Sequence, residues 1–243
     1  GTRKGDKVEL TAQEEKIIAA HEGGHAILAY VLPDCPTIEK STIATGEDET
    51  LGYVMQAVKK NKYITTENEL LDDICVLMGG RVAEEVIFGH DKVSSGASSD
   101  IQYATDLARS MVTKWGMSDK LGPLQYEASQ EGYLGMGSTQ RTMAGAETNK
   151  LIDAEIKSLV EGGLKRAEDV LKAQEDKLHL LAQAMLEFET LSGDEIDQLI
   201  ETGKFDRPDK PSGTGSVKPI AGSSIPKAGK KFGGSGGAKP QGA

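Results

Sequence analysis

The spacing of apolar residues near the start of the chain predicts a helix. Ile17, Ile18 and Leu28 recur at helical intervals together with histidines at positions 21 and 25. The preceding segment, Thr11-Ala12-Gln13-Glu14, resembles a capping box, in which a hydroxyl and a carboxylate three residues apart satisfy backbone amides at a helix N-terminus. We therefore expect a helix from about residue 11 that carries both histidines on one face.

Two short segments after this helix have the character of β-strands. They run from Ile38 to Thr45 and from Leu51 to Ala57, and the join between them, residues 46–50, is acidic. A hairpin is the simplest arrangement of two such strands. The acidic join is either a solvated turn or a segment close to a bound substrate, and both alternatives stay open.

The second half of the chain has a helical period. Between Glu147 and Gln174 the apolar residues recur about every 3.6 positions, so we expect one long amphipathic helix, or two if Gly162-Gly163 interrupts it. A further helix is expected from about Lys177 to Glu189, and Ser192 with Glu195 forms a capping box before another. These apolar stripes predict core packing more than subunit contact. The segment from Glu127 to Thr142 has no clear period, and we assign it no role.

These patterns predict a mainly α fold with one small β hairpin. With 243 residues and 37% hydrophobic content the chain can bury a substantial core. Residues 206–243 hold five of the eight prolines and seven basic against two acidic side chains, a net charge of +5. Such a composition predicts a disordered tail. We expect a linker at 1–10, a folded domain at 11–205 with parts at 11–120 and 145–205, and the tail at 206–243.

Charge and cysteine content exclude several classes of protein. The total net charge is −10, so the part before the tail carries −15, which argues against nucleic-acid binding. Cys35 and Cys75 are the only cysteines and form no disulfide framework, as expected in a reducing compartment. There is no signal peptide, no apolar run long enough to span a bilayer and no phosphate-binding loop, so we expect this chain to be soluble and not to bind ATP itself.

The segment His21-Glu22-Gly23-Gly24-His25 carries the most specific chemistry. On a helix, histidines four residues apart lie one turn apart on the same face, so both imidazoles can reach one zinc ion. A zinc ion with an open position activates a water molecule, and the neighbouring carboxylate of Glu22 can take its proton. This pattern predicts metal-assisted hydrolysis of a peptide bond.

The third protein ligand is not determined by spacing. The extended pattern with a further glycine and histidine is absent, because Leu28 and Val31 occupy those positions. The remaining candidates are Glu84, Glu85 and Asp100, with His90 as a weaker one, and each acid could equally have a structural role.

Four segments of the chain, taken together, resemble one known family. They are residues 20–26 around the histidine pair, Met78-Gly79-Gly80-Arg81-Val82-Ala83-Glu84-Glu85, Ser95-Gly96-Ala97-Ser98-Ser99-Asp100, and residues 111–118. In order and separation they are similar to the peptidase domain of the FtsH family of membrane-anchored, ATP-dependent zinc metalloproteases, over residues 11 to about 205. The resemblance implies that Asp100 completes a zinc site with His21 and His25, and that Glu84 and Glu85 are structural or lie behind the ligands.

The resemblance also implies a function and its partners. Glu22 would activate water in a zinc endopeptidase that cleaves unfolded or membrane-extracted polypeptide within a homo-hexamer. ATP and Mg²⁺ would bind only an ATPase upstream of this chain, and the membrane contact, at the cytoplasmic face of the bacterial inner membrane, would also lie upstream, which makes this chain a C-terminal fragment or piece. The alternative is a zinc-binding assembly module of the ring that no longer cleaves. The four intact residues, His21, Glu22, His25 and Asp100, argue against it.

Overall fold

The computed structural model describes residues 9–45, 50–58, 62–126 and 145–207. The described elements follow one another along the chain as helix α1 (Ala12–Val31), strands β1 (Ile38–Thr42) and β2 (Tyr53–Gln56), helices α2 (Glu67–Phe88), α3 (Ser98–Thr113), α4 (Ala146–Ala173) and α5 (Glu175–Phe188), strand β3 (Thr190–Ser192) and helix α6 (Gly193–Thr202). Two short 3-10 turns, His90–Lys92 and Ser95–Ala97, lead from α2 into α3. The expected mainly α fold is confirmed.

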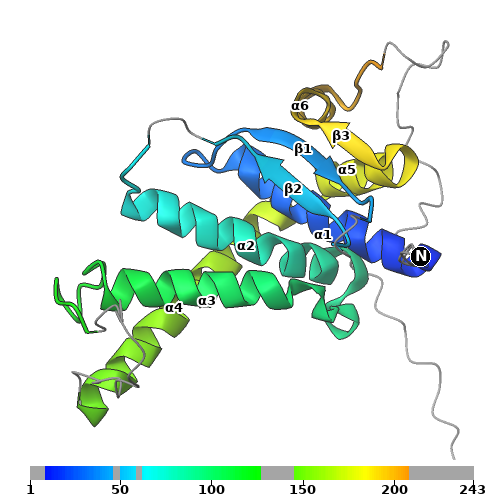
Figure 1. Ribbon diagram of the computed structural model, residues 1–243. Coiled ribbons are helices and arrows are strands. Elements are labelled where there is room, and N and C mark those ends of the chain that lie inside the picture. The colour runs from blue at the N-terminus through cyan, green and yellow to red at the C-terminus, as the bar shows by residue number, and fades with distance from the viewer. Residues whose placement is uncertain (1–8, 46–49, 59–61, 127–144, 208–243) are drawn as a thin grey trace, which may run out of the picture.

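The helices are layered beneath a small sheet. Figure 1 shows the strands lying over α1, which packs against α2, while α2 contacts both α3 and α4. The side chains of Ile27, Leu28, Ile74 and Ile87 are fully buried between α1, α2 and their neighbours. Helix α1 is thus enclosed on several sides, and its residues from Ala19 to Ala29 are all buried.

The sheet has one strand more than the sequence predicted. The strand order is β2-β1-β3 and both pairs are antiparallel, so the expected hairpin is present, with each strand shorter than its predicted range. Strand β3 has only three residues, of which only Leu191 is buried, too few for an alternating pattern to be recognised. Strand β1 lies between β2 and β3, so β2 is an edge strand among the described strands.

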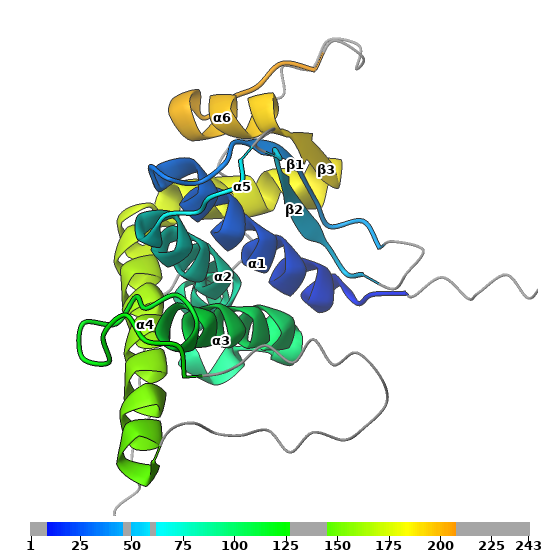
Figure 2. The same ribbon diagram turned by 60° about the vertical axis from the view of Figure 1, so that its left-hand side comes forward.

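Helix α4 is a single helix through Gly162-Gly163. Gly163 is buried, and a Cβ atom on it would lie 2.6 Å from Ile74 Cγ2. The absent side chain lets α4 pass close to α2, and this contact offsets the poor helix propensity of glycine. Figure 2 shows the N-terminal turns of α4 extending past α3.

Side-chain caps fix the starts of three helices. The capping boxes predicted at Thr11 and Ser192 are both present, and a third at Thr66, closed by Glu69, was not predicted although its sequence has the same form. Near the C-terminal end of the described residues, the Arg207 guanidinium lies over the Phe188 and Phe205 rings and pairs with Glu195. Arg207 lies two residues past the boundary expected for the folded domain.

Several expectations lie outside the described residues. The segment from Glu127 to Thr142, most of the acidic join at 46–50 and the tail from residue 208 belong to this group. Among the described helices, none combines the length and apolar character that crossing a bilayer requires.

Candidate metal centre

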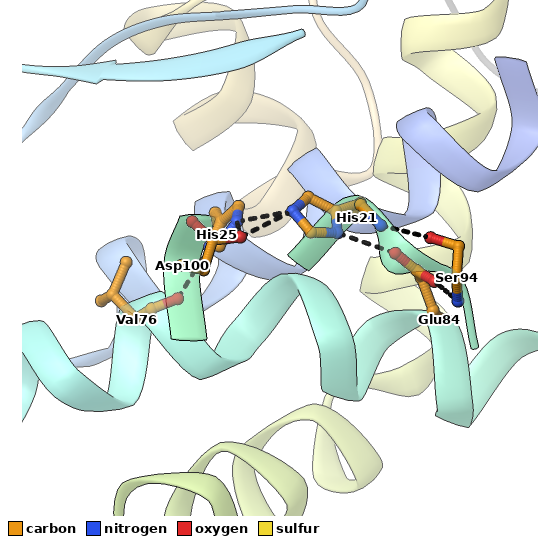
Figure 3. Close-up of polar contacts among 7 residues, drawn as sticks. His21, His25, Val76, Glu84, Ser94 and Asp100 are labelled. Atoms are coloured by element: carbon orange, nitrogen blue, oxygen red, sulfur yellow. Dashed lines mark hydrogen bonds and ion pairs between the residues drawn. The ribbon is translucent and has the colours of Figure 1, made fainter. Parts of the chain in front are cut away.

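Helices α1 and α3 bring His21, His25 and Asp100 to one point. The Nε2 atoms of the two histidines are 3.0 Å apart. Asp100 Oδ2 lies 3.0 Å from His21 Nε2 and 3.4 Å from His25 Nε2. The two imidazoles come from successive turns of α1, and Asp100 lies in the first turn of α3, so three side chains separated by up to 79 residues share one small volume (Figure 3).

The other ring nitrogen of each histidine faces an oxygen acceptor. His21 Nδ1 lies 2.8 Å from Glu84 Oε1, and His25 Nδ1 lies 2.7 Å from the Val76 carbonyl oxygen (Figure 3). A carbonyl oxygen only accepts, so Nδ1 of His25 carries the proton, and the Glu84 carboxylate imposes the same tautomer on His21. In each neutral ring the Nε2 lone pair then points toward Asp100 and the other histidine.

This donor set fits a zinc ion. Two imidazole nitrogens and one carboxylate oxygen are a common ligand set for catalytic zinc, and zinc-to-ligand bonds of about 2.0–2.1 Å place tetrahedral ligands about 3.3 Å apart. The separations of 3.0, 3.0 and 3.4 Å are close to that value. Three electron-rich atoms this close repel one another unless a cation or a proton lies between them. Of the described residues, only these three form such a group.

The ionisation of the ligands reflects the same crowding. Burial lowers the pKa of His21, but hydrogen bonds with Asp100 and Glu84 and the charge of Glu22 outweigh it and raise that pKa to about 9. Burial opposes ionisation of Asp100, yet hydrogen bonds with His21 and His25 hold its pKa far below its usual range. The site therefore favours a positive charge at its centre, which zinc or a proton can supply.

Glu22 lies beside these ligands on α1. It is buried, and burial raises the pKa of its carboxyl group, while the positive charges of His25 and His21 oppose that rise. Glu22 lines the same cleft as the three ligand residues. A carboxylate next to a metal centre can act as a general base, and a raised pKa makes it a stronger one.

The two other acidic ligand candidates, both on α2, have different surroundings. Glu84 is almost fully buried and accepts hydrogen bonds from His21 and from the Ser94 backbone amide, so it contacts the ring nitrogen of His21 that does not face Asp100. Glu85 and His90 instead pair with each other on the exposed surface. The structure thus brings His21, His25, Asp100, Glu22 and Glu84 together and leaves Glu85 and His90 outside.

Glycines permit the close crossing of α1 and α2. A Cβ atom on Gly24 would lie 2.3 Å from the Gly79 carbonyl oxygen, and one on Gly80 would lie 2.3 Å from ring atoms of His21. Both contacts are far shorter than van der Waals separation, so only glycine fits at these two positions. The His21 ring therefore rests directly against the backbone of α2.

Two partners of the metal site were not found by sequence reasoning. They are the Val76 carbonyl and the Ser94 amide, which orient His25 and Glu84. Both are backbone groups, which every residue carries, so no side-chain pattern could have identified them. The pair of glycines at 79–80 was the one available signal that α2 passes close to the histidine helix.

The metal site opens into a cleft of about 680 Å³. Metal-site residues of α1 and α3 form one part of its lining, and residues of β2 and the segment before it, from Thr50 to Val54, form another. Ile18 and Leu77 add apolar surface. A chain lying in this cleft would have the edge of the sheet on one side and the metal ligands on the other.

Comparisons with known proteins identify the family of this chain. The model of peptidase family M41 matches residues 8–199. ATP-dependent zinc metalloprotease FtsH from Caulobacter vibrioides (strain NA1000 / CB15N) is 42% identical over 211 residues, which cover 86% of this chain and 34% of that protein. The protein of the same name from Rickettsia bellii (strain RML369-C) is 42% identical over 199 residues, covering 81% of this chain and 31% of that protein.

A more distant relative gives the same picture. ATP-dependent zinc metalloprotease FtsH 3 from Petrotoga mobilis (strain DSM 10674 / SJ95) is 38% identical over 193 residues, covering 79% of this chain and 30% of that protein. The chain thus spans about a third of the length of the relatives it matches. The resemblance found from four sequence segments is confirmed, and the chain belongs to peptidase family M41.

Proposed function

We propose that the chain is a zinc-dependent endopeptidase domain in which His21, His25 and Asp100 bind Zn²⁺ and Glu22 is the general base. One observation carries this proposal. Two Nε2 atoms and one carboxylate oxygen meet within 3.4 Å, while both Nδ1 atoms are turned to acceptors. That arrangement leaves the metal-binding atoms free to face the cleft that Glu22 also lines.

The protein residues have separate tasks in the reaction. Zinc, when bound, acts as a Lewis acid and lowers the pKa of a water molecule to about 7. Glu22 accepts a proton as the water attacks the scissile carbonyl carbon, and it then gives that proton to the leaving amine. The raised pKa of Glu22 suits both transfers. Glu84 and the Val76 carbonyl hold the two imidazoles in place throughout.

The cleft supports a polypeptide substrate in extended form. Among the described strands, β2 is an edge of the sheet and borders the cleft, so its outer backbone groups can pair with a substrate strand. Such pairing reads main chain rather than side chains, which suits unfolded or membrane-extracted proteins with little sequence preference. A folded protein cannot present an extended segment at this depth, so an unfolding step must precede cleavage.

The names of the relatives support coupling to an ATPase. We propose that ATP and Mg²⁺ act through a part of the protein outside this chain, that the assembly is a homo-hexamer, and that any membrane contact also comes from outside this chain. Its place would then be the cytoplasmic face of the bacterial inner membrane.

Cleavage of an already unfolded protein tests the proposal. Casein needs no ATP-driven unfolding, so we expect the zinc-loaded chain to cleave it, and we expect a chelator or Glu22→Gln to abolish cleavage. Glu22→Gln should retain one equivalent of zinc, measured by metal analysis. Full activity of that variant would disprove the assigned mechanism. Bound zinc without any cleavage by the wild-type chain would favour an assembly module.

A second pair of variants tests the third ligand. Asp100→Ala removes a carboxylate from the metal centre, so zinc affinity should fall sharply. Glu85→Ala, on the exposed side of α2, is the control and should leave affinity unchanged. The opposite result, with weak binding only in Glu85→Ala, would show that the assignment of Asp100 is wrong.

A further inference from the structure

A second groove leads away from the metal site between α2 and α3. Its volume is about 510 Å³. Figure 1 shows these two helices side by side, and Leu77 of α2 and Leu107 of α3 form apolar walls. Gln56, Val76 and Leu77 line both this groove and the cleft of the metal site. The two spaces are therefore adjacent, with these three residues between or along both.

The groove runs outward from the metal ligands along both helices. The carbonyl of Val76 holds His25, and Asp73 lies three residues earlier on α2, about 4.5 Å along the helix axis. On α3, Asp106 lies six residues after Asp100, about 9 Å along the axis. One long side chain of a substrate bound at the metal site can span this distance.

The charge of the groove is negative. Asp106 lines it and is exposed, and the other polar side chains of its lining include Tyr103, Ser110 and Gln56, with no cationic residue in the described lining. Asp73 also lines the groove but already interacts within the chain, and Asp106 is the more exposed of the two carboxylates. An apolar wall with a carboxylate beyond it matches a side chain with an aliphatic stem and a cationic end.

We infer that this groove is a specificity subsite for an arginine or lysine side chain of the substrate. The aliphatic stem packs against Val76, Leu77 and Leu107, and the cationic group reaches Asp106 beside the Tyr103 ring. Asp106 is then a specificity-determining residue that takes no part in the chemistry. The inference rests on the proposed function, because it assumes that polypeptide occupies the adjoining cleft.

Peptide binding to an inactive variant measures this preference without cleavage. Zinc-loaded Glu22→Gln is titrated into fluorescein-labelled alanine-serine peptides that differ at one central residue, which is arginine, citrulline, leucine or glutamate. Citrulline has the shape of arginine without its charge. Main-chain pairing with β2 is the same for every peptide, so the central residue alone sets the difference in affinity. We expect the arginine peptide to bind about 3- to 5-fold more tightly than the citrulline peptide.

Two further variants in the Glu22→Gln background locate the effect. Asp106→Asn should reduce the arginine preference to less than about 2-fold. Asp153→Asn removes one negative charge from an exposed position on α4. This control variant has the same net charge as Asp106→Asn and should keep the preference for the arginine peptide. Asp106→Lys should favour the glutamate peptide instead. Zinc content and circular dichroism establish that each variant is folded.

The possible results separate the subsite from the peptidase activity. Equal affinity for the arginine and citrulline peptides, or a preference that survives Asp106→Asn, overturns the subsite. Tightest binding of the leucine peptide, unaffected by either Asp106 variant, assigns the groove to apolar side chains and also overturns it. Charge-selective binding without chelator-sensitive cleavage of casein by the wild-type chain leaves the subsite in place and refutes the peptidase activity.

Discussion

At His21, one imidazole ring has contacts on three sides. Glu84 accepts from Nδ1, Nε2 faces Asp100 and His25, and the ring face rests on Gly80. Rotation about either side-chain bond would break at least one of these contacts. The ring is thus oriented by residues of α2 and α3 before any ligand arrives, so little conformational entropy is lost when a metal binds.

Loss of the Glu84 charge should weaken zinc binding. Glu84→Gln keeps the shape of the side chain but no longer enforces the His21 tautomer with a carboxylate, so we expect zinc affinity to fall about 10- to 100-fold. Competition with a chelating dye measures this affinity. The matched control is Glu85→Gln, one residue along α2 and exposed, which should bind zinc as the wild type does. Equal affinities of the two variants would contradict the role given to Glu84.

The residues of the proposed metal centre differ in how far the sequence alone identifies them. The spacing of His21 and His25 sufficed to identify two adjacent nitrogens, because a helix fixes their separation. Asp100 could not be chosen over Glu84 or Glu85 by spacing, since its contact with His21 spans 79 residues and depends on how α3 packs, and only the family resemblance selected it. The contact of the Val76 backbone oxygen with His25 could not be predicted, because a pattern of side chains does not show which backbone groups form contacts.

Among the helices, the crossing of α1 and α2 positions the residues of the proposed metal centre. Gly24 and Gly79 bring the two backbones into contact, and Gly80 makes room for the His21 ring. A larger residue at any of these positions must separate the helices or displace the ring. The geometry of the site therefore depends on missing side chains as much as on those present.

A methyl group at Gly80 should disrupt the metal site. Gly80→Ala places a Cβ atom 2.3 Å from the imidazole of His21, so we expect zinc affinity to fall by at least 10-fold. Gly162→Ala is the control, because nothing lies within 4 Å of its Cβ position in α4. That control should stabilise the protein by about 0.5–1 kcal/mol. Zinc titration and urea unfolding measure the two effects, and unchanged zinc affinity in Gly80→Ala would refute the tight contact.

The cap of α6 should give a pH-dependent contribution to stability. Burial raises the pKa of Glu195, but hydrogen bonds from Arg207 and from the Ser192 backbone outweigh it and lower that pKa in the folded state. A lowered folded-state pKa stabilises the fold above about pH 4.5, the unfolded value, and this contribution disappears as the pH falls through the folded-state pKa.

Urea unfolding at pH 7 and pH 3.5 tests this contribution. Glu195→Gln should lose about 1 kcal/mol of unfolding free energy at pH 7 and much less at pH 3.5. Glu161→Gln, on the exposed face of α4, should change little at either pH. A loss in Glu195→Gln that is the same at both pH values would mean that the ionised carboxylate is not the stabilising form.

Elements differ in how far the sequence predicts them. Helices α1 and α6 have capping boxes and regular apolar spacing, so their starts were predicted correctly. The apolar spacing over α4 is compatible with one helix or two. The packing of Gly163 against Ile74, which favours one helix, cannot be predicted from the sequence of α4 alone. Strand β3 was not predicted, because its three residues form a strand only by pairing with β1, some 150 residues earlier in the chain.

In the molecule as a whole, the proposed metal centre joins elements that otherwise meet mainly through α2. Its proposed ligands come from α1 and α3, and both of these helices pack on α2. A zinc ion bound at this point would link the first and third helices directly. Its binding free energy then adds to the stability of the entire domain.

Removal of zinc should lower the thermal stability. At a free zinc concentration of about 100 times the dissociation constant, binding adds about 2.7 kcal/mol, so we expect a chelator to lower Tm by about 5–10 °C. Scanning calorimetry of Glu22→Gln measures this without self-cleavage. Asp100→Ala provides the control and should be insensitive to the chelator. An unchanged Tm in Glu22→Gln would mean that zinc does not link the helices.

The position of β3 has a consequence for the order of folding. Every proposed catalytic group lies within the first 100 residues, whereas β1 receives its second neighbour only from residues 190–192. During synthesis, the strand beside the cleft belongs to an incomplete two-stranded sheet until nearly the whole domain has left the ribosome. Closing so long a loop is slow and entropically costly. The nascent chain thus completes the sheet beside the cleft last, after the residues of the proposed metal site have been made.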